Sequence, residues 1–151
     1  MEGRIVAVCH SDRKGVRKTD IGEGALKEGF GLEGDAHGGD WHRQVSLLSV
    51  SSIDKMRGRG LDVGYGDFAE NLTIEGLDVW SLPVGARLEA GEALLEVTQI
   101  GKECHAGCAI FRQVGECIMP REGVFARVVR GGRVRRGDPV RVVGDAGRDG
   151  S

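Results

Sequence analysis

Three of the four cysteines in this 151-residue chain, Cys104, Cys108 and Cys117, fall close together in the sequence. Lys102 and His105 flank Cys104. Cationic neighbours lower the pKa of a thiol, so more of it is thiolate, which is the form that attacks electrophiles and binds soft metals. The segment therefore predicts a chemically used thiol, which would bind molybdenum, zinc or copper, or carry sulfur as a persulfide.

Two other interpretations of these thiols stay open. Cys104, Cys108 and Cys117 would give three ligands to a structural zinc ion, with a histidine as the fourth. Against this, adjacent Cys104 and His105 do not easily reach one ion, and no second tight cysteine–histidine pair occurs. The other alternative is that the cysteines are plain buried side chains.

A second cluster of reactive side chains lies in the glycine-rich stretch Gly34–Gln44, which holds two histidines, two aspartates, a tryptophan and an arginine. Exposed backbone N–H groups beside histidine and arginine suit an anion such as a phosphate. We therefore predict that His37, His42 and Arg43 bind an anionic ligand. The spacing of the two histidines matches no standard zinc pattern. The alternative is an ordinary turn in which aspartates bond to the local backbone.

A third stretch, Gly64–Leu72, reads as a loop that leads into a strand. Asp67 and Asn71 would orient a ligand there, together with Glu70, or would only cap and turn the chain. The residue types alone favour the structural alternative.

Arginines are frequent in the C-terminal third of the chain. Arg121 lies near the cysteine segment in the sequence, and a guanidinium pairs bidentately with phosphate, so we predict that it adds charge to an anion site. The other arginines fit a solvated strand or turn equally well, in particular Arg133, Arg135 and Arg136.

The elements that must position these residues are mainly strands. Short β-branched and aliphatic runs, closed by glycine or an acidic turn, predict strands at Arg4–Cys9, Gln44–Val50, Asn71–Ile74, Ala86–Ala90, Ala93–Ile100, Gly123–Val129 and Pro139–Val143. A short helix is predicted over Ser51–Arg57, with Ser51 or Ser52 as N-cap and Gly58 as its end. A further turn or two of helix is predicted at Ala109–Val114. This pattern predicts a mainly β barrel or sandwich.

Composition narrows the class of protein. The length fits one domain, and a net charge of −2 argues against a surface built wholly for nucleic acid or an anionic membrane. No apolar run approaches the ~18–20 residues of a membrane helix, and the N-terminus lacks the order of a signal peptide. We expect a cytoplasmic chain with reduced thiols.

Taken in order, these motifs resemble the MOSC domain, which is named for the C-terminal domain of molybdenum cofactor sulfurases. The resemblance rests on Gly34–Gly39 with His42–Leu48, on Gly66–Leu72, on Ile100–Cys108, and on Met119–Val128. The last two stretches look like the small bacterial stand-alone members. The resemblance implies a single-domain β-barrel with a few short helices over residues 1–143, followed by a flexible tail at 144–151.

The family's hallmark is one cysteine that binds molybdenum or carries sulfur. By resemblance this role falls to Cys108, which precedes Ala109-Ile110, with Cys104 as the second choice. The implied ligand is the molybdenum–molybdopterin cofactor, and the implied partners are a sulfur-donor protein or a molybdoenzyme, with no nucleic acid and no membrane.

Two departures from larger family members narrow the expected role. A chain of 151 residues has no room for the pyridoxal-phosphate desulfurase domain of full sulfurases, so pyridoxal phosphate is not expected. The long N-terminal β-barrel extension of the larger molybdenum-binding reductases is also missing. We therefore expect a carrier or accessory role, with sulfur transfer as its conceivable activity. The alternative is a non-catalytic domain that is stapled by zinc or that binds a partner protein.

Overall fold

The computed structural model of the protein describes residues 2–12, 18–36, 38–101 and 119–145. Its strands are β1 (Glu2–His10), β2 (Thr19–Asp20), β3 (Glu23–Lys27), β4 (Gly31–Leu32), β5 (Val45–Ser49), β6 (Leu72–Glu75), β7 (Ala86–Ala90), β8 (Ala93–Ile100), β9 (Val124–Arg130), β10 (Gly132–Arg135) and β11 (Pro139–Asp145). Its helices are α1 (Val50–Arg57), the 3-10 turn η1 (Val79–Ser81) and α3 (Met119–Glu122).

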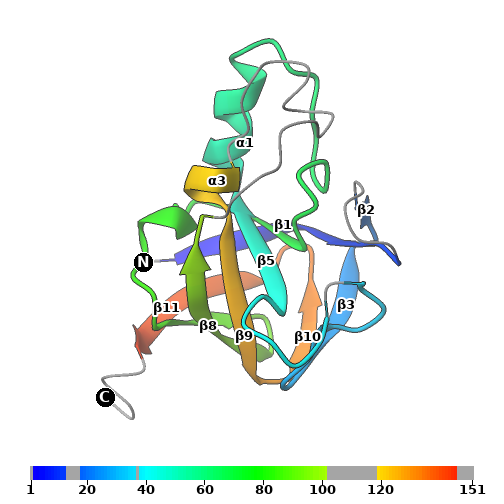
Figure 1. Ribbon diagram of the computed structural model, residues 1–151, viewed down its shortest axis with the longest axis vertical. Helices are drawn as coiled ribbons and strands as arrows, with labels where there is room; N and C mark the ends of the chain where they lie inside the picture. The colour runs from blue at the N-terminus through cyan, green and yellow to red at the C-terminus, as the bar shows by residue number, and fades with distance from the viewer. Residues whose placement is uncertain (1, 13–17, 37, 102–118, 146–151) are drawn as a thin grey trace.

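Seven strands pair in the order β11-β7-β8-β9-β5-β6-β1, and a ladder between β1 and β11 closes the ring into a barrel (Figure 1). The closing ladder is antiparallel and pairs Glu2 with Arg141 and Arg4 with Pro139. β5 and β6 pair in parallel, whereas the other ladders of the ring are antiparallel. Because a parallel pair needs a crossover connection, α1 and the loop after it carry the chain from β5 to β6.

A smaller sheet of β10, β3 and β4 lies beside the barrel, and β2 pairs with the end of β1. The sequence did not predict these four strands. The two longer strands of the four, β3 and β10, each have one buried large apolar residue, Leu26 and Val134. The other residues of these two strands are glycine, alanine or charged, so the alternation typical of a strand is weak.

The barrel interior is filled by aliphatic side chains from every strand of the ring. In β7 and β8 buried residues alternate with more exposed ones, as expected for strands with one face on a core. β5 is buried along its whole length because α1 and the residues after it cover its outer side. That cover forms a second apolar cluster made of Leu48, Ile53, Met56, Leu61, Val63, Phe68 and Phe125.

The predicted short helix is present, but its predicted N-cap is wrong. The residue at the N-cap is Ser49, not Ser51 or Ser52, and its side chain makes no capping hydrogen bond. The Ser49 hydroxyl instead donates to the Leu77 carbonyl at 2.8 Å and accepts from the Val79 amide at 2.9 Å. Ser52 is buried and donates to Glu122 of α3 at 2.6 Å, so the serines at this end join the helix to its neighbours.

The expected fold class, a mainly β single-domain barrel with a few short helices, is confirmed. β11 continues to Asp145, two residues beyond the expected end of the domain. The helix predicted at Ala109–Val114 lies outside the described residues. In the part of the chain that is described, no helix is both long enough and apolar enough to cross a membrane.

Candidate functional site

The predicted site residues divide into two groups. Cys104, Cys108, Cys117 and His37 lie outside the described residues, whereas His42, Arg43, Asp67, Asn71 and Arg121 lie within them. Among the described residues, no three histidine, cysteine or acidic side chains gather closely enough to hold a metal ion.

His42 and Arg43 are brought together by Gln99, a residue that the sequence analysis missed. The Gln99 Oε1 atom lies 2.9 Å from His42 Nε2 and accepts a hydrogen bond from Arg43 Nε at 3.2 Å. The Gln99 amide nitrogen donates to the Gly101 carbonyl at 2.7 Å. We call these residues, His42, Arg43 and Gln99, the His42–Arg43–Gln99 cluster.

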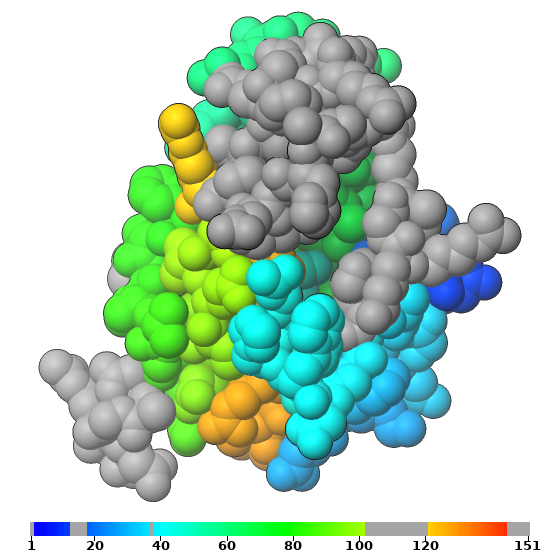
Figure 2. Space-filling model, viewed as in Figure 1, coloured from blue at the N-terminus to red at the C-terminus, as the bar shows by residue number. Residues whose placement is uncertain are grey.

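The backbone of this cluster is also anchored to the barrel. The Thr98 hydroxyl, one residue before Gln99 on β8, contacts the His42 carbonyl and donates to the Phe125 carbonyl at 3.1 Å. Phe125 is the β9 residue paired with Gln99. The loop before β5 is therefore held against the β8–β9 ladder, and residues far apart in sequence form one site. Figure 2 shows this loop, in cyan, on the viewed face beside β8 and β9.

Arg43 carries a charge that no carboxylate of the described residues neutralises. Its guanidinium lies over the Phe125 ring, 5.1 Å from the centroid, and 6.0 Å from the Trp41 ring. It is half-buried, and within the described residues it makes no ion pair. Arg87, which is also half-buried, pairs with Glu96 at 3.2 Å. A partly desolvated guanidinium without a counter-ion is suited to bind an anion.

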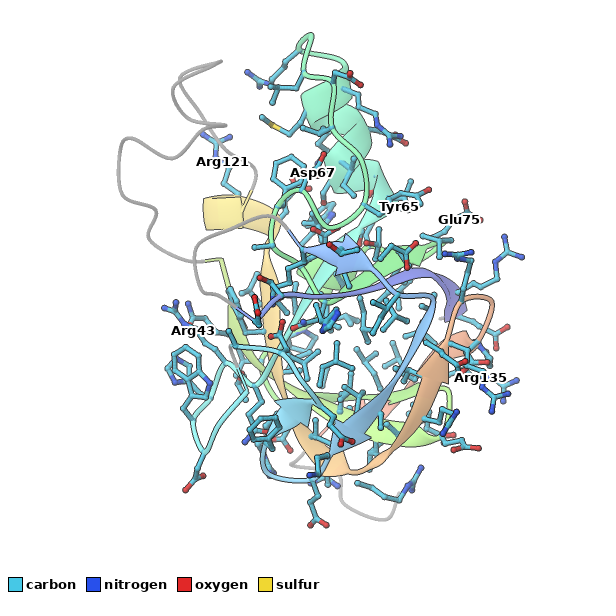
Figure 3. The ribbon with its side chains drawn as sticks, turned by 90° about the vertical axis from the view of Figure 1, so that its right-hand side faces the viewer. Arg43, Tyr65, Asp67, Glu75, Arg121 and Arg135 are labelled. Carbon is cyan, nitrogen blue, oxygen red and sulfur yellow. The ribbon has the colours of Figure 1, made fainter. Side chains whose placement is uncertain are left out.

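This cluster lies at the point where the chain enters and leaves the cysteine segment. Gly101 follows the last residue of β8, and its amide donates to the Gly123 carbonyl at 2.6 Å, so the described chain before 102–118 is joined to the described chain after it. Arg121 is exposed on α3 in the same region. In Figure 3 Arg121 and Arg43 lie toward the same side of the molecule, away from Arg135.

Asp67 and Asn71 are occupied by hydrogen bonds within the fold. Asp67 accepts from the Gly64 amide at 2.8 Å. Asn71 is fully buried, accepts from the Ser46 amide at 2.9 Å and donates to the Cys9 carbonyl at 3.0 Å. These contacts support the structural alternative for this loop, in which its polar residues turn and anchor the chain.

Glu70, between them, is a fully buried carboxylate. It accepts hydrogen bonds from the Gly66 amide at 2.9 Å, the Phe68 amide at 3.2 Å and the Thr73 hydroxyl at 2.8 Å. Burial raises the pKa of Glu70, and these hydrogen bonds oppose that rise. The carboxylate thus holds the loop in shape from inside the protein.

A buried ion pair connects Lys18 with Asp35 at the same end of β1, where the Lys18 amide also donates to the Gly66 carbonyl at 2.8 Å. The Lys18 Nζ atom donates to both carboxylate oxygens of Asp35, at 2.8 and 2.9 Å, and both side chains are inaccessible to solvent. Asp35 also accepts from the Ser11 amide at 3.1 Å. Burial lowers the pKa of Lys18, and its hydrogen bond to Asp35 opposes that shift. Asp35 therefore bonds to Lys18 and Ser11, which lie 17 and 24 residues earlier in the chain, and ties its loop to the end of β1.

The thiol of Cys9 is unsuited to nucleophilic chemistry. It is fully buried in β1. Burial, together with the negative charge of Glu70 and Asp20, raises the pKa of Cys9 to about 12. A thiol in such surroundings stays protonated and inert.

A groove of about 480 Å³ opens elsewhere on the surface, lined by Glu2, Ser51, Ile74, Gly76, Leu77, Asp78 and Ser81. None of the predicted site residues lines it. Because Arg43 makes no ion pair within the described residues, the His42–Arg43–Gln99 cluster, and not this groove, is the candidate anion site.

Residues 33–141 match the MOSC domain family. The chain belongs to the MOSC domain family. This family is associated with molybdenum-cofactor proteins, so the expected relationship is confirmed at the level of the family. The match includes the candidate anion site and the cysteine segment.

Solved structures show the same fold. The YuaD protein of Bacillus subtilis is 18% identical with a TM-score of 0.76, and the match covers 93% of this MOSC chain and 94% of that one. YiiM from Escherichia coli is 22% identical with a TM-score of 0.65, covering 95% and 70% of the two chains. YiiM from Geobacillus stearothermophilus is 22% identical with a TM-score of 0.66, covering 93% and 73%. No curated protein sequence matches the chain.

Proposed function

We propose that this MOSC domain handles the molybdenum cofactor in the cytoplasm, as an accessory to the maturation of molybdoenzymes. In this proposal it binds the molybdopterin-type cofactor, or carries sulfur to it, through the thiol of Cys108. Cys104 is the second candidate for that thiol. The partners would be a sulfur-donor protein and a molybdoenzyme.

The observation that carries this proposal is the half-buried charge of Arg43, for which the described residues supply no counter-ion. A phosphate of the cofactor would supply the missing counter-ion, and His42 and Arg121 would add hydrogen bonds and charge. His37 belongs to the same glycine-rich loop in the sequence and is proposed as a further contact. Asp67 and Asn71 would act indirectly, by shaping the loop that contains them.

The described residues fit the anionic part of such a cofactor and offer no ligand set for its metal. The resemblance to the family assigns the metal-binding role to Cys108, whose thiolate would be a soft ligand for molybdenum. When bound, molybdenum would supply a redox-active centre.

Sulfur carriage needs no oxidant. The Cys108 thiolate would attack the terminal sulfur of a donor persulfide, forming a new S–S bond, and the donor would leave as a thiolate. In the sequence, the cysteine segment directly follows Gly101, which comes after the strand that carries Gln99.

The test is to purify the full chain from a host that makes molybdenum cofactor, and to measure bound metals, bound pterin and intact mass. We expect molybdenum with a pterin, or added sulfur mass that reduction removes. Cys108→Ser should lose this load and keep the wild-type unfolding transition. Cys104→Ser is the matched control and should keep the load; the reverse result would assign the role to Cys104.

Other outcomes would overturn the proposal. One zinc per chain, with unfolding on chelation, would show a structural zinc site, since such sites contribute folding energy directly. A chain that carries no metal, pterin or sulfur and cannot be loaded in vitro would be a partner-binding module.

A further inference from the structure

The hydrogen bonds of the Gln99 side chain fix which way its carboxamide faces. The Gly101 carbonyl can only accept, and Arg43 Nε can only donate. The amide nitrogen of Gln99 must therefore face Gly101, at 2.7 Å, and its oxygen must face Arg43, at 3.2 Å. The choice between oxygen and nitrogen, which is often ambiguous for glutamine, is settled here by its neighbours.

That orientation also fixes the proton on His42. The same Gln99 oxygen lies 2.9 Å from His42 Nε2, and an oxygen without a hydrogen can only accept. His42 Nε2 must carry a hydrogen, so neutral His42 is held as the Nε2–H tautomer. Its Nδ1 atom has no hydrogen-bond partner among the described residues and is left for a ligand.

We propose that Gln99 is a positioning residue of the anion site, acting through His42 and Arg43. This inference rests on the proposed function, in which that pair binds an anionic group. With Nε held by Gln99 and the guanidinium plane supported by Phe125, the terminal nitrogens of Arg43 form a preset fork for an oxyanion. The ligand class is a phosphate monoester or a similar oxyanion.

Most of the hydrogen-bonding capacity of Gln99 is used within the protein: its oxygen accepts from His42 and Arg43, and one of its two amide hydrogens is donated to Gly101. We therefore infer that its main effect on binding passes through the residues that it holds. A substitution at Gln99 should weaken anion binding more when Arg43 is present to use the Gln99 oxygen than when Arg43 is replaced, and this dependence distinguishes positioning from direct contact.

The experiment uses the full, nitrogen-15-labelled chain, with inorganic phosphate as the probe. In the wild type, we expect the Arg43 Nε–H signal to be slowed in solvent exchange, and the His42 nitrogens to report the Nε2–H tautomer at a pH where histidine is neutral. In Gln99→Leu both signatures should be lost, and phosphate affinity should fall about tenfold, as for one charge-assisted hydrogen bond.

The same change is then made in an Arg43→Lys background, because lysine keeps the charge and lacks Nε. There, only the part of the effect that passes through His42 remains, so Gln99→Leu should lower phosphate affinity by clearly less than the loss of about tenfold in the wild-type background. Gln99→Glu keeps oxygen acceptors but gives Arg43 a carboxylate, so it should retain the slowed Arg43 signal and lose phosphate binding. Thermal unfolding of each variant verifies that the fold is intact.

Wild-type phosphate affinity in Gln99→Leu, or an equal loss in both Arg43 backgrounds, would overturn the inference. A wild-type chain that binds no phosphate would overturn it as well, together with the anion site. None of these results changes the metal and mass analysis at Cys108, so failure of Gln99 and failure of the thiol proposal are distinguishable.

Discussion

At the scale of single residues, the buried polar groups of this domain have fixed hydrogen-bonding roles. Glu70 accepts through both oxygens, so a side chain with one donor end cannot replace it without setting donor against donor. We expect Glu70→Gln to lower the free energy of unfolding by about 1–3 kcal/mol, the cost of a buried group left unsatisfied. Urea denaturation at neutral pH measures this.

The matched control for that variant is Glu89→Gln on β7, where the side chain is exposed. It should change stability by no more than about 0.5 kcal/mol. Equal stability of the two variants would show that the Glu70 carboxylate is not needed to hold the Gly64–Leu72 loop.

Cys9 predicts a pH dependence of stability. Its pKa rises from 9.0 to about 12 on folding, so above pH 9 the unfolded thiol loses its proton while the folded thiol keeps it. Ionisation then favours the unfolded chain, and stability falls as pH rises, by at most about 1.4 kcal/mol per pH unit from this group. Below pH 9 the thiol contributes no slope.

The measurement is the free energy of unfolding against pH for the wild type and for Cys9→Ala. The variant loses packing at every pH, so the informative quantity is the slope, which should be shallower above about pH 9 in Cys9→Ala. A thiol reagent should leave Cys9 unmodified in the folded protein and modify it after unfolding. Identical slopes would rule out a strongly raised Cys9 pKa.

The sequence predicts part of the candidate site: it indicates His42 and Arg43 but not Gln99. His42 and Arg43 were recognisable because their residue types suit an anion. Gln99 was not, because its role depends on the pairing of β8 with β9 and on a loop 56 residues earlier in the chain. The ion pair of Lys18 with Asp35 also joins residues that are distant in the sequence, and no local sequence pattern predicts it.

At the scale of elements, the seven strands predicted from apolar and β-branched runs are the seven strands of the closed ring. The strands that were missed are short or carry one inward apolar side chain, as in β10, where Val134 is the buried residue. Their structure comes from pairing with a neighbour and not from their own pattern. The N-cap of α1 was misplaced because the contacts of Ser49, with the Leu77 carbonyl and the Val79 amide, lie far from it in the sequence.

Ser49 offers a test of how the start of α1 is joined to η1. Its hydroxyl links the start of α1 to η1 by accepting from the Val79 amide and donating to the Leu77 carbonyl, both in a buried setting. We expect Ser49→Ala to destabilise the protein by about 1–3 kcal/mol. Ser51→Ala is the control: its hydroxyl donates to Asp78 at an exposed position, and the expected loss is below about 1 kcal/mol. A larger loss for Ser51→Ala, measured by urea denaturation, would contradict the assignment.

At the scale of the whole molecule, the barrel and the α1 cluster are not independent bodies. Phe125 lies in the apolar cluster beneath α1, while its ring supports Arg43 and its strand belongs to the ring of the barrel. The candidate anion site therefore lies where the apolar interior of the barrel meets the apolar cluster beneath α1. A sequence with many glycines and few predicted helices indicates such a barrel. It does not indicate which face of the barrel binds a ligand.

The closing ladder between β1 and β11 determines how the molecule would respond to a pulling force. Glu2 pairs with Arg141, so the outer ends of the two strands lie at the same end of an antiparallel ladder. If the N-terminal end of β1 and the C-terminal end of β11 were pulled apart, the force would break the hydrogen bonds of the ladder one after another. It would not load them all at once in shear. Few hydrogen bonds bear the load at any moment, so the barrel opens at its seam under low force. A protein that is closed against solvent on every side of the ring is thus mechanically soft along one line.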